Sequence, residues 1–434
     1  MKSSPRPDLD PTKGYLTSLT LENIRCFGSP AETMSLTKPG SDTQPARWTV
    51  ILGANGVGKT TALRAISGFS GEPEYHPVPS TPLITYDPVQ QVFARFKRIS
   101  RQPLLTGNIQ IANSAQDSFG GHFSFVSLQS GGTNATGYSS RYGPRLAAYG
   151  AGRAWRGSNE ISSGATDTLS DRDARVRNPS ETLFHYDYRE KSEKLNRPSR
   201  FEAFKKALTC GILPLVTDLR MGFAADDRPI IEFATPDGWI ALDDMSWGYQ
   251  VFAAFAADYA SRLIEWYPDS KAPLHEPGIC LVDELDLHMH PKWQREVIDH
   301  LSNVFPATQF IVTVHSPLVV QAAEDANLVV LKRYPDDQSR VHIDNDVEAI
   351  KGWRIDQVLT SDLFGLDSAR SIPVADDLAE RRKLLGKNTL TRKESARLKV
   401  LEEGAMSLPI PGSAFEQEAL KLVAEAAAKL KHLG

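Results

Sequence analysis

The sequence predicts an α/β protein built on a mostly parallel, buried central sheet. Residues 48–53 (WTVILG) form an apolar run that ends in glycine, and the helical spacing of Leu63 and Ile66 follows it. Further along, strand-like and helical segments alternate over 279–282, 291–304, 309–314 and 328–332. Such alternation is typical of a parallel sheet with helices packed on its faces.

Other patterns predict smaller elements around this sheet. Residues 15–27 alternate apolar and polar side chains as a strand does, and 228–242 is typical of a hairpin that turns at Pro236, Asp237 and Gly238. A long helix is expected after Ser246, whose hydroxyl suits a helix N-cap. Less regular patterns predict strands at 83–86 and 122–128, loops at 113–140 and 157–168, and helices at 199–212, 374–403 and 414–432.

Composition excludes several classes of protein. The chain has 434 residues and a formal net charge of −4, so no global positive field attracts nucleic acid, and only a local basic patch could do so. Three scattered cysteines without C-x-x-C spacing indicate a reducing, cytoplasmic location rather than a disulfide framework. The polar, Pro-rich start does not resemble a signal peptide, and no stretch of about 18 apolar residues predicts a membrane span. We therefore expect no membrane partner.

The most specific motif is a Walker A loop, G-x-x-x-x-G-K-[ST], made of Gly53, Ala54, Asn55, Gly56, Val57, Gly58, Lys59 and Thr60. Its glycines let backbone N–H groups turn toward phosphates, and the following helix presents its positive N-terminus to them. We expect Lys59 to reach the β- and γ-phosphates of ATP and the Thr60 hydroxyl to coordinate Mg²⁺. Thr61 completes the expected nucleotide-binding segment.

A second acidic motif follows an apolar strand. Residues 279–284 (ICLVDE) have the form of a Walker B strand, with four apolar residues and then two carboxylates. Asp283 would hold Mg²⁺ through its water shell, and Glu284 would orient or deprotonate the attacking water. An apolar strand that ends in acids is common by itself, but here it follows a complete Walker A loop.

The segment 245–250 (MSWGYQ) distinguishes between classes of P-loop protein. Its serine hydroxyl, a glycine N–H and a helix N-terminus could together hold an anion. It resembles the signature of ABC ATPases, whose core is L-S-G-G-Q, although Met245 and Trp247 depart from that pattern. The resemblance implies that Ser246 and Gly248 face the γ-phosphate held by a second protomer. The alternative is a helix N-cap without any partner.

A histidine follows the predicted strand at 309–314. The segment 310–317 (FIVTVHSP) resembles the strand that carries the switch histidine of ABC ATPases. The resemblance implies that His315 contacts the γ-phosphate. A histidine at a strand end can also be purely structural.

Taken in order, MSWGYQ, LVDELDLHMHPKWQ and FIVTVHSP resemble standalone bacterial AAA/ABC-type ATPases of the OLD-like, RecF-like and SMC-like group. Members of this group often act in phage defence beside a nuclease or other effector, as Septu and retron-associated ATPases do, and others act in DNA repair. The resemblance implies ATP and Mg²⁺ as ligands and a homodimer or higher homo-oligomer. It also implies a nuclease-like effector protein as partner, with DNA as an alternative.

The same resemblance also suggests roles for an arginine, an aspartate and a glutamine. Residues 149–153 (YGAGR) are similar to a Tyr-Gly-x-x-Arg element, so Arg153 would meet a phosphate or the partner protomer, or else be a solvated surface arginine. In LDLHMHPKWQ, Asp286 is expected at the dimer interface, and the spacing of His288 and His290 also permits a metal site. The expected Q-loop glutamine has four candidates, namely Gln90, Gln91, Gln102 and Gln129.

The resemblance implies an ABC-type P-loop NTPase fold with an antiparallel β subdomain, an inserted helical region and a C-terminal helical tail. The expected organisation is a disordered tail at 1–14, an ATPase domain at 15–333 with an irregular and helical insertion at about 113–227, and a helical extension at 334–434. In the extension, Thr391 and Glu394 fit the capping-box pattern. No D-x-D pair after residue 333 suggests the Toprim nuclease site of OLD proteins.

These motifs predict one mechanism and leave alternatives open. Two protomers would sandwich two ATP·Mg molecules, and hydrolysis would release them. The alternatives are a non-hydrolysing, ATP-gated scaffold for an effector, a DNA-repair ATPase of RecF type, and a nucleotide-binding subunit of a transporter. Arginines between residues 141 and 177 could contact DNA, although acidic neighbours also suit a solvated loop.

Overall fold

The structure is a computed structural model of the whole chain. It describes residues 8–11, 13–22, 25–67, 104–111, 145–153, 155, 164–171, 174–193, 198–213, 215–347, 350, 352–361, 363–366, 368–387 and 389–406. The strands expected at 83–86 and 122–128, the helix expected at 414–432 and the four candidate Q-loop glutamines lie outside these residues. The chain divides into two compact units, Met1–Gly365 and Leu366–Gly434.

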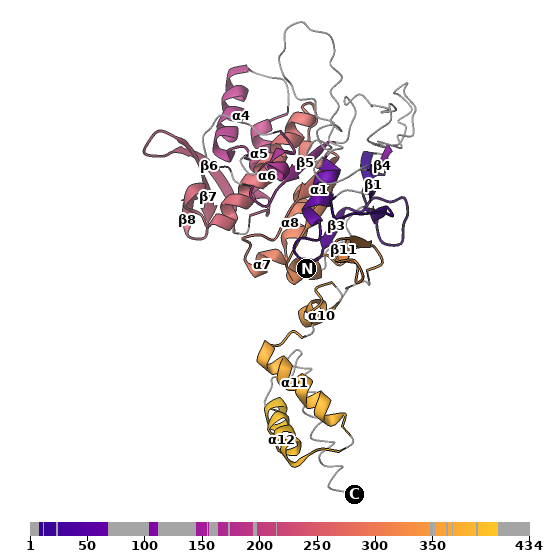
Figure 1. Cartoon of the computed structure of the whole chain (residues 1–434). Coiled ribbons are helices and arrows are strands. Elements are labelled where there is room, and N and C mark those ends of the chain that lie inside the picture. The colour runs from indigo at the N-terminus through magenta and orange to yellow at the C-terminus, as the bar shows by residue number, and fades with distance from the viewer. Residues whose placement is uncertain are drawn as a thin grey trace. The chain divides into compact units, whose positions relative to one another are not determined.

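A six-stranded sheet forms the centre of the first unit, as the sequence predicts (Figure 1). Its strand order is β12-β11-β3-β10-β9-β5. The bounds are β3 Trp48–Leu52, β5 Leu146–Tyr149, β9 Gly278–Val282, β10 Thr308–Thr313, β11 Asn327–Arg333 and β12 Val341–Asp344. All neighbours pair in parallel except β11 and β12. The parallel strands therefore end at one edge, and the loops that follow β3, β9 and β10 meet there.

Two antiparallel sheets accompany the central sheet. One has the order β2-β1-β4 and consists of β1 Lys13–Glu22, β2 Glu32–Ser35 and β4 Leu104–Ile111. The other has the order β6-β7-β8 and consists of β6 Asp218–Phe223, β7 Pro229–Thr235 and β8 Gly238–Ala241. The predicted hairpin turns where Thr235 pairs with Gly238, whose φ of +108° favours glycine. The antiparallel β component of the predicted fold is thus confirmed.

Helices cover both faces of the central sheet. The bounds are α1 Lys59–Ser67, α3 Asp167–Ser170, α4 Pro179–Glu193, α5 Arg200–Thr209, η2 Leu242–Asp244, α6 Trp247–Trp266, η3 Pro273–His275, α7 Pro291–Gln294, α8 Val297–Val304, α9 Pro317–Ala322 and α10 Ile355–Thr360. One hydrophobic core joins Val50 and Leu52 to α5 and α6, and the other joins Ile51 to α1 and β1. Alternate side chains of β3 thus enter opposite cores, which explains its unbroken apolar sequence. The single helix predicted at 291–304 is interrupted between α7 and α8.

A buried ionic network ties α6 to the edge strand β5. The Asp258 carboxylate is completely buried and accepts hydrogen bonds from Tyr149 Oη and Arg262 Nε, each at 2.7 Å. The backbone N–H of Arg177 donates to the other oxygen of Asp258 at 3.3 Å. Burial alone would raise the pKa of Asp258, but the charges of Arg262 and Arg177 outweigh burial and lower it. The position of α6 is therefore coupled to β5.

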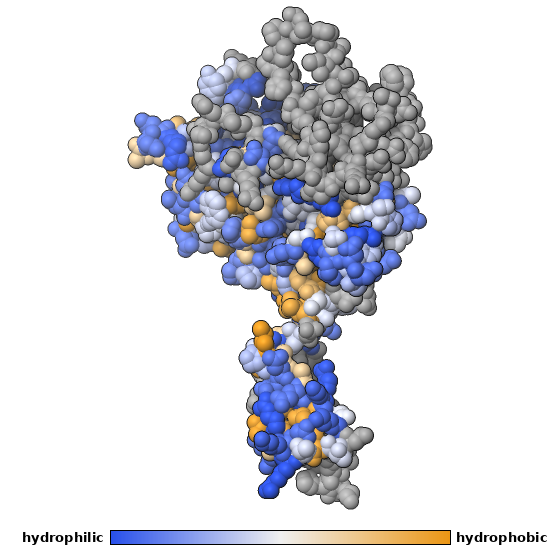
Figure 2. Space-filling model, viewed as in Figure 1, coloured by the Kyte–Doolittle hydropathy of each residue, from blue (hydrophilic) through white to orange (hydrophobic). Residues whose placement is uncertain are grey.

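The second unit contains a pair of helices, α11 Ile372–Leu385 and α12 Arg392–Met406. The predicted capping box is present, because Glu394 N donates to Thr391 Oγ1 at 3.3 Å and Thr391 N donates to Glu394 Oε2 at 2.9 Å. Figure 2 shows apolar patches among the hydrophilic surface of this pair, where Ile372, Leu385 and Val400 are exposed.

The first unit extends further than the sequence suggested. The predicted helical extension began at residue 334, but β12 pairs with β11 and α10 packs against α9 within the first unit. A strand at residues 341–344 was not anticipated, because four residues carry too little periodicity to reveal it. Among the described residues, no helix combines the length and apolar character that crossing a membrane requires.

Replacing Asp258 with Asn should destabilise the fold strongly. The change leaves the buried Arg262 guanidinium without its carboxylate, and breaking a buried pair in this way costs roughly 3–5 kcal/mol. The control is Asp187→Asn on α4, which removes an exposed pair with Lys191 and should cost less than about 1 kcal/mol. Urea unfolding of the full chain measures both, and equal losses would contradict the coupling.

Candidate functional site

The loop after β3 has the geometry that its glycines permit. Gly53, Gly56 and Gly58 have φ values of +138°, +79° and +96°. A Cβ atom at Gly53 would lie 2.5 Å from the Leu331 carbonyl oxygen, and one at Gly58 would lie 2.5 Å from Cys26 Sγ. Glycine is therefore needed both for backbone conformation and for space. The loop leads directly into the N-terminus of α1, where backbone N–H groups are free to bind an anion.

Lys59 is folded back onto this loop. Its Nζ donates to the carbonyl oxygens of Gly53 at 2.7 Å and Ala54 at 3.0 Å, and the residue is only 7% exposed. Burial lowers the pKa of Lys59, while the nearby carboxylates of Asp283 and Glu284 act in the opposite direction. The two carbonyls thus hold the ammonium group beside the loop, close to where an anion would enter.

The loops after β3, β9 and β10 converge on one carboxylate. Thr60 Oγ1 donates to Asp283 Oδ2 at 2.7 Å, and Thr313 Oγ1 donates to Asp283 Oδ1 at 2.6 Å. Asp283 is buried, and each of its oxygens is fixed by one of these bonds. A hydroxyl beside a carboxylate is a donor set of the hard oxygen type that Mg²⁺ prefers. Thr60 and Asp283 could therefore hold a magnesium ion together with substrate oxygens.

Glu284 lies in a tight turn after β9. Its φ of +50° is in the left-handed region, which is unusual for a residue other than glycine. Its backbone N–H donates to Thr313 Oγ1 at 2.7 Å, and Leu285 N donates to the Thr313 carbonyl at 3.0 Å. The side chain is half-buried and lies next to Asp283 at the edge of the sheet that also carries the Walker A loop.

Arg153 lies behind this turn and not at the surface. It is 1% exposed, and its terminal nitrogens donate to the carbonyls of Asp283 at 2.7 Å and Glu284 at 3.0 Å. Burial lowers the pKa of Arg153 to about 10, which still leaves it charged at neutral pH. The solvated-arginine alternative is therefore wrong, because the side chain is buried. Both terminal nitrogens are engaged by backbone carbonyls of the turn, and a contact of Arg153 with a phosphate or with the partner protomer stays a prediction.

The N-terminus of α6 carries the exposed pair Ser246 and Trp247. Ser246 takes the N-cap position, but its hydroxyl makes no capping hydrogen bond, so the expected cap is made by backbone alone. Trp247 is 43% exposed. A Cβ atom at Gly248 would lie 2.3 Å from the His288 carbonyl oxygen. Packing of α6 against the turn after β9 therefore explains why residue 248 is glycine.

His315 is exposed at the end of β10. Its backbone N–H donates to Asp286 Oδ2 at 3.0 Å, which links the loop after β10 to the loop after β9. The Asp286 carboxylate is buried rather than presented to solvent. Of His288 and His290, the pair considered for a metal, His290 has a structural role. Its Nδ1 accepts a hydrogen bond from Lys292 N and caps α7.

Three residues near the loop were not predicted from the sequence. Thr313 holds Asp283 and Glu284 as described above. Arg25 Nη1 donates to Thr61 Oγ1 at 3.4 Å, and Arg333 Nη2 donates to the Gly56 carbonyl at 3.0 Å. Both arginines come from segments outside any motif: Arg25 lies between β1 and β2, and Arg333 is the last residue of β11, which pairs with β3. Of the three, only Thr313 could have been detected in the sequence. It is the last residue of β10, and β10 pairs with β9, the strand that precedes the acid pair.

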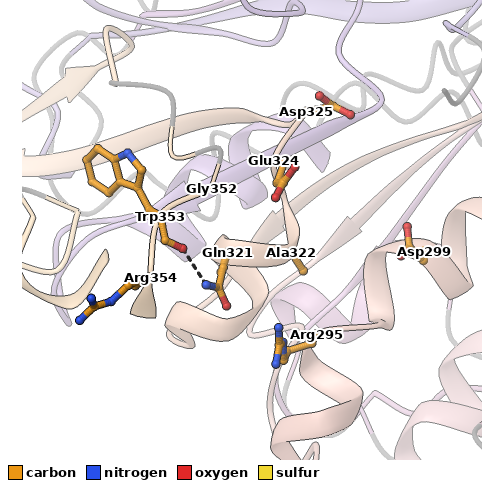
Figure 3. A pocket seen from close by; sticks show the side chains of 9 residues that line it. All are labelled: Arg295, Asp299, Gln321, Ala322, Glu324, Asp325, Gly352, Trp353 and Arg354. Atoms are coloured by element: carbon orange, nitrogen blue, oxygen red, sulfur yellow. Dashed lines mark hydrogen bonds between the residues drawn. The ribbon is translucent and has the colours of Figure 1, made fainter. Parts of the chain in front are cut away.

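An open, polar pocket of about 520 Å³ lies elsewhere in the first unit (Figure 3). Gln321 lies in it and donates to the Trp353 carbonyl at 2.7 Å, and Arg295, Glu324 and Arg354 contribute to its lining. None of the predicted site residues lines this pocket. The candidate site is defined by the strand edge and not by this cavity.

The fold and this strand edge have the features of a P-loop nucleotide-binding site and resemble those of ABC-type proteins. These features are the parallel sheet, the Walker A loop after β3 and the acid pair after β9. In the sheet, β10 lies between β3 and β9.

The comparisons agree with this class. Residues 216–321 match the protein family described as "AAA domain, putative AbiEii toxin, Type IV TA system". The Septu protein PtuA of Bacillus mycoides is 32% identical over 36% of this chain and 21% of its own length, and that of Bacillus thuringiensis is 31% identical over 42% of this chain and 47% of its own length. The Retron Vc95 probable ATPase of Vibrio cholerae is 39% identical over 21% of this chain and 18% of its own length.

These matches confirm the resemblance to defence-associated AAA/ABC-type ATPases. The chain nevertheless spans only 18% to 47% of the length of these three curated relatives. Among solved structures, an SMC head bound to the C-winged helix domain of ScpA is similar at 16% identity, over 76% of this chain and 97% of that one, with a TM-score of 0.42.

Replacing Gly248 with Ala should destabilise the first unit without any nucleotide or partner. The added methyl group meets the His288 carbonyl, which cannot move cheaply, and overpacking of this kind costs roughly 1–3 kcal/mol. The matched control is Gly152→Ala, because no atom lies within 4 Å of the added Cβ there. Thermal unfolding of both variants tests this, and an unchanged midpoint for Gly248→Ala would contradict the packing explanation for this glycine.

Proposed function

We propose that the chain is a Mg²⁺-dependent ATPase that dimerises around ATP and works as the regulatory or motor component of a defence system. The observation that carries this proposal is the convergence of Thr60, Thr313 and Glu284 on or beside one carboxylate, Asp283. The convergence joins the Walker A loop to the acid pair in the way that in-line hydrolysis of a phosphoric anhydride requires.

Each residue of the site has a role in this proposal. The N–H groups of Gly53–Thr60 bind the β- and γ-phosphates, and Lys59 leaves the carbonyls of Gly53 and Ala54 to neutralise the phosphate charge. Thr60 and Asp283 would hold Mg²⁺, which when bound would neutralise further phosphate charge. Glu284 orients the attacking water and accepts its proton as the water oxygen bonds to the γ-phosphorus. The bond from the γ-phosphorus to the bridging β-phosphate oxygen breaks in the same step, so ADP is the leaving group and inorganic phosphate is the second product.

The second half of the site comes from another copy of the chain. Ser246 is exposed, makes no capping bond and stands at the positive end of the long helix α6, so its hydroxyl is available to a γ-phosphate. His315 is likewise exposed at the edge that carries the Walker A loop. In this arrangement ATP joins two protomers, and its hydrolysis lets them separate.

The biological setting follows from the relatives. Proteins named for Septu and retron systems are 32% and 39% identical to parts of this chain. We propose that this chain works together with an effector protein, and we expect that effector to be a nuclease. Of the arginines considered for DNA contact, Arg153 is buried and Arg177 is paired with Glu265, whereas Arg145 is exposed, so DNA stays an alternative partner.

Replacing Glu284 with Gln should retain ATP binding, reduce turnover at least about a hundredfold and trap a dimer. The amide preserves size and hydrogen bonding but cannot accept the proton of the attacking water, and loss of a general base of this kind typically costs 10²–10⁴-fold. Phosphate release measures turnover, and light scattering with and without ATP measures assembly.

The control is Lys59→Ala, which should abolish binding and leave a monomer under all conditions. If Glu284→Gln retains wild-type phosphate release, Glu284 is not the base. If the wild-type protein binds ATP and dimerises but releases no phosphate, the chain is an ATP-gated scaffold instead.

A further inference from the structure

The turn that carries Glu284 has an unusual arrangement of carbonyl groups. The carbonyl oxygens of three successive residues, Asp283, Glu284 and Leu285, lie 2.7, 3.0 and 3.5 Å from the terminal nitrogens of Arg153. Arg153 Nη1 also donates to the Gly150 carbonyl at 3.2 Å. One side chain thus collects the carbonyls of the whole turn, while Thr313 binds the N–H groups of Glu284 and Leu285 from the other side.

A guanidinium is suited to this position and an ammonium is not. Its planar fork carries donors at fixed angles, so it can bind several carbonyls that lie in different directions, whereas a lysine presents one compact charge. The left-handed backbone of Glu284 is the conformation that turns these carbonyls toward a single point. Conversely, a backbone that is otherwise unfavourable for glutamate persists only where surrounding contacts determine it.

Arg153 also contacts the helix that begins at Ser246. Its Cζ lies 5.9 Å from the centre of the Phe255 ring on α6, within the range of a cation–π contact. The same ring packs edge-on against Tyr149 at 4.8 Å, and Tyr149 is bonded to Asp258 of α6. A displacement of α6 along this face therefore acts on Arg153 and Tyr149 together.

We infer that Arg153 is a positioning residue: it sets the orientation of Glu284 through the carbonyls of residues 283–285, and it links that orientation to the position of α6. This inference rests on the proposed hydrolytic role of Glu284. Arg153 itself touches neither phosphate nor water in this assignment. Contact of a second copy with the N-terminus of α6 would thereby influence the turn that holds the base.

The test compares Arg153→Lys and Arg153→Met with Arg177→Met in the full chain. Arg177 belongs to the same α6 network, through Asp258 and Glu265, but does not touch the turn. Both Arg153 variants should lower kcat at least tenfold and change KM for ATP less than threefold. Arg177→Met should lower the unfolding midpoint and leave kcat within threefold of wild type.

Two kinetic results would overturn the inference. Wild-type kcat in Arg153→Lys would show that charge alone suffices, and a raised KM with unchanged kcat would show that Arg153 meets the nucleotide. Turnover in the wild-type protein, abolished by Glu284→Gln, is the separate check on the proposed function.

A second measurement decides the positional claim even without turnover. Hydrogen–deuterium exchange of the peptide that spans residues 279–289 reports the amides of Glu284 and Leu285. Arg153→Lys should speed their exchange at least tenfold, while Arg177→Met should not. Unchanged protection in Arg153→Lys would exclude the positioning role, whatever the protein does with ATP.

Discussion

The site depends on one buried carboxylate, Asp283. Its two oxygens accept hydrogen bonds from Thr60, in the first turn of α1, and from Thr313, the last residue of β10. Because β10 lies between β3 and β9, this carboxylate is the point where three adjacent strands are joined by side chains as well as by backbone. A charge at this depth is tolerated because both oxygens are bonded. The same bonds hold the first turn of α1 next to the turn of Glu284. The residues proposed to bind phosphate and the residue proposed to activate water are thus positioned by the same carboxylate.

Much of this could be predicted from the sequence, because the decisive signals are local. The Walker A loop requires glycine at defined positions, and the φ values of Gly53, Gly56 and Gly58 show why. The apolar runs at β3 and β9 are long enough to indicate buried parallel strands. The order of the strands in the sheet cannot be predicted from any local pattern. That the loops meet at one edge can be predicted, because parallel strands all end at the same edge.

The remainder depends on tertiary contacts. Arg153 has the same sequence pattern whether it binds phosphate or backbone, and only the packing of β5 beside β9 decides between them. Gly248 matches the pattern of a signature motif, but the approach of His288, far along the chain, gives it a second reason to be glycine. The sequence does not reveal that the central sheet continues after residue 333, because β12 is a short strand that is recognised by its pairing with β11. Local patterns identify residues; long-range packing assigns their contacts.

The place of β11 in the central sheet has a consequence for how the protein is made. β3, which precedes the Walker A loop, pairs on one side with β10 and on the other with β11, and Thr49 is opposite Asn327. β3 can therefore form its pairs only with β10 and β11, two strands that are synthesised much later. Contacts of such high sequence separation fold slowly, since a long loop must close before they form. Since Arg333 of β11 also bonds the Gly56 carbonyl, we expect the nucleotide-binding loop to reach its final contacts only after residue 333 has been synthesised.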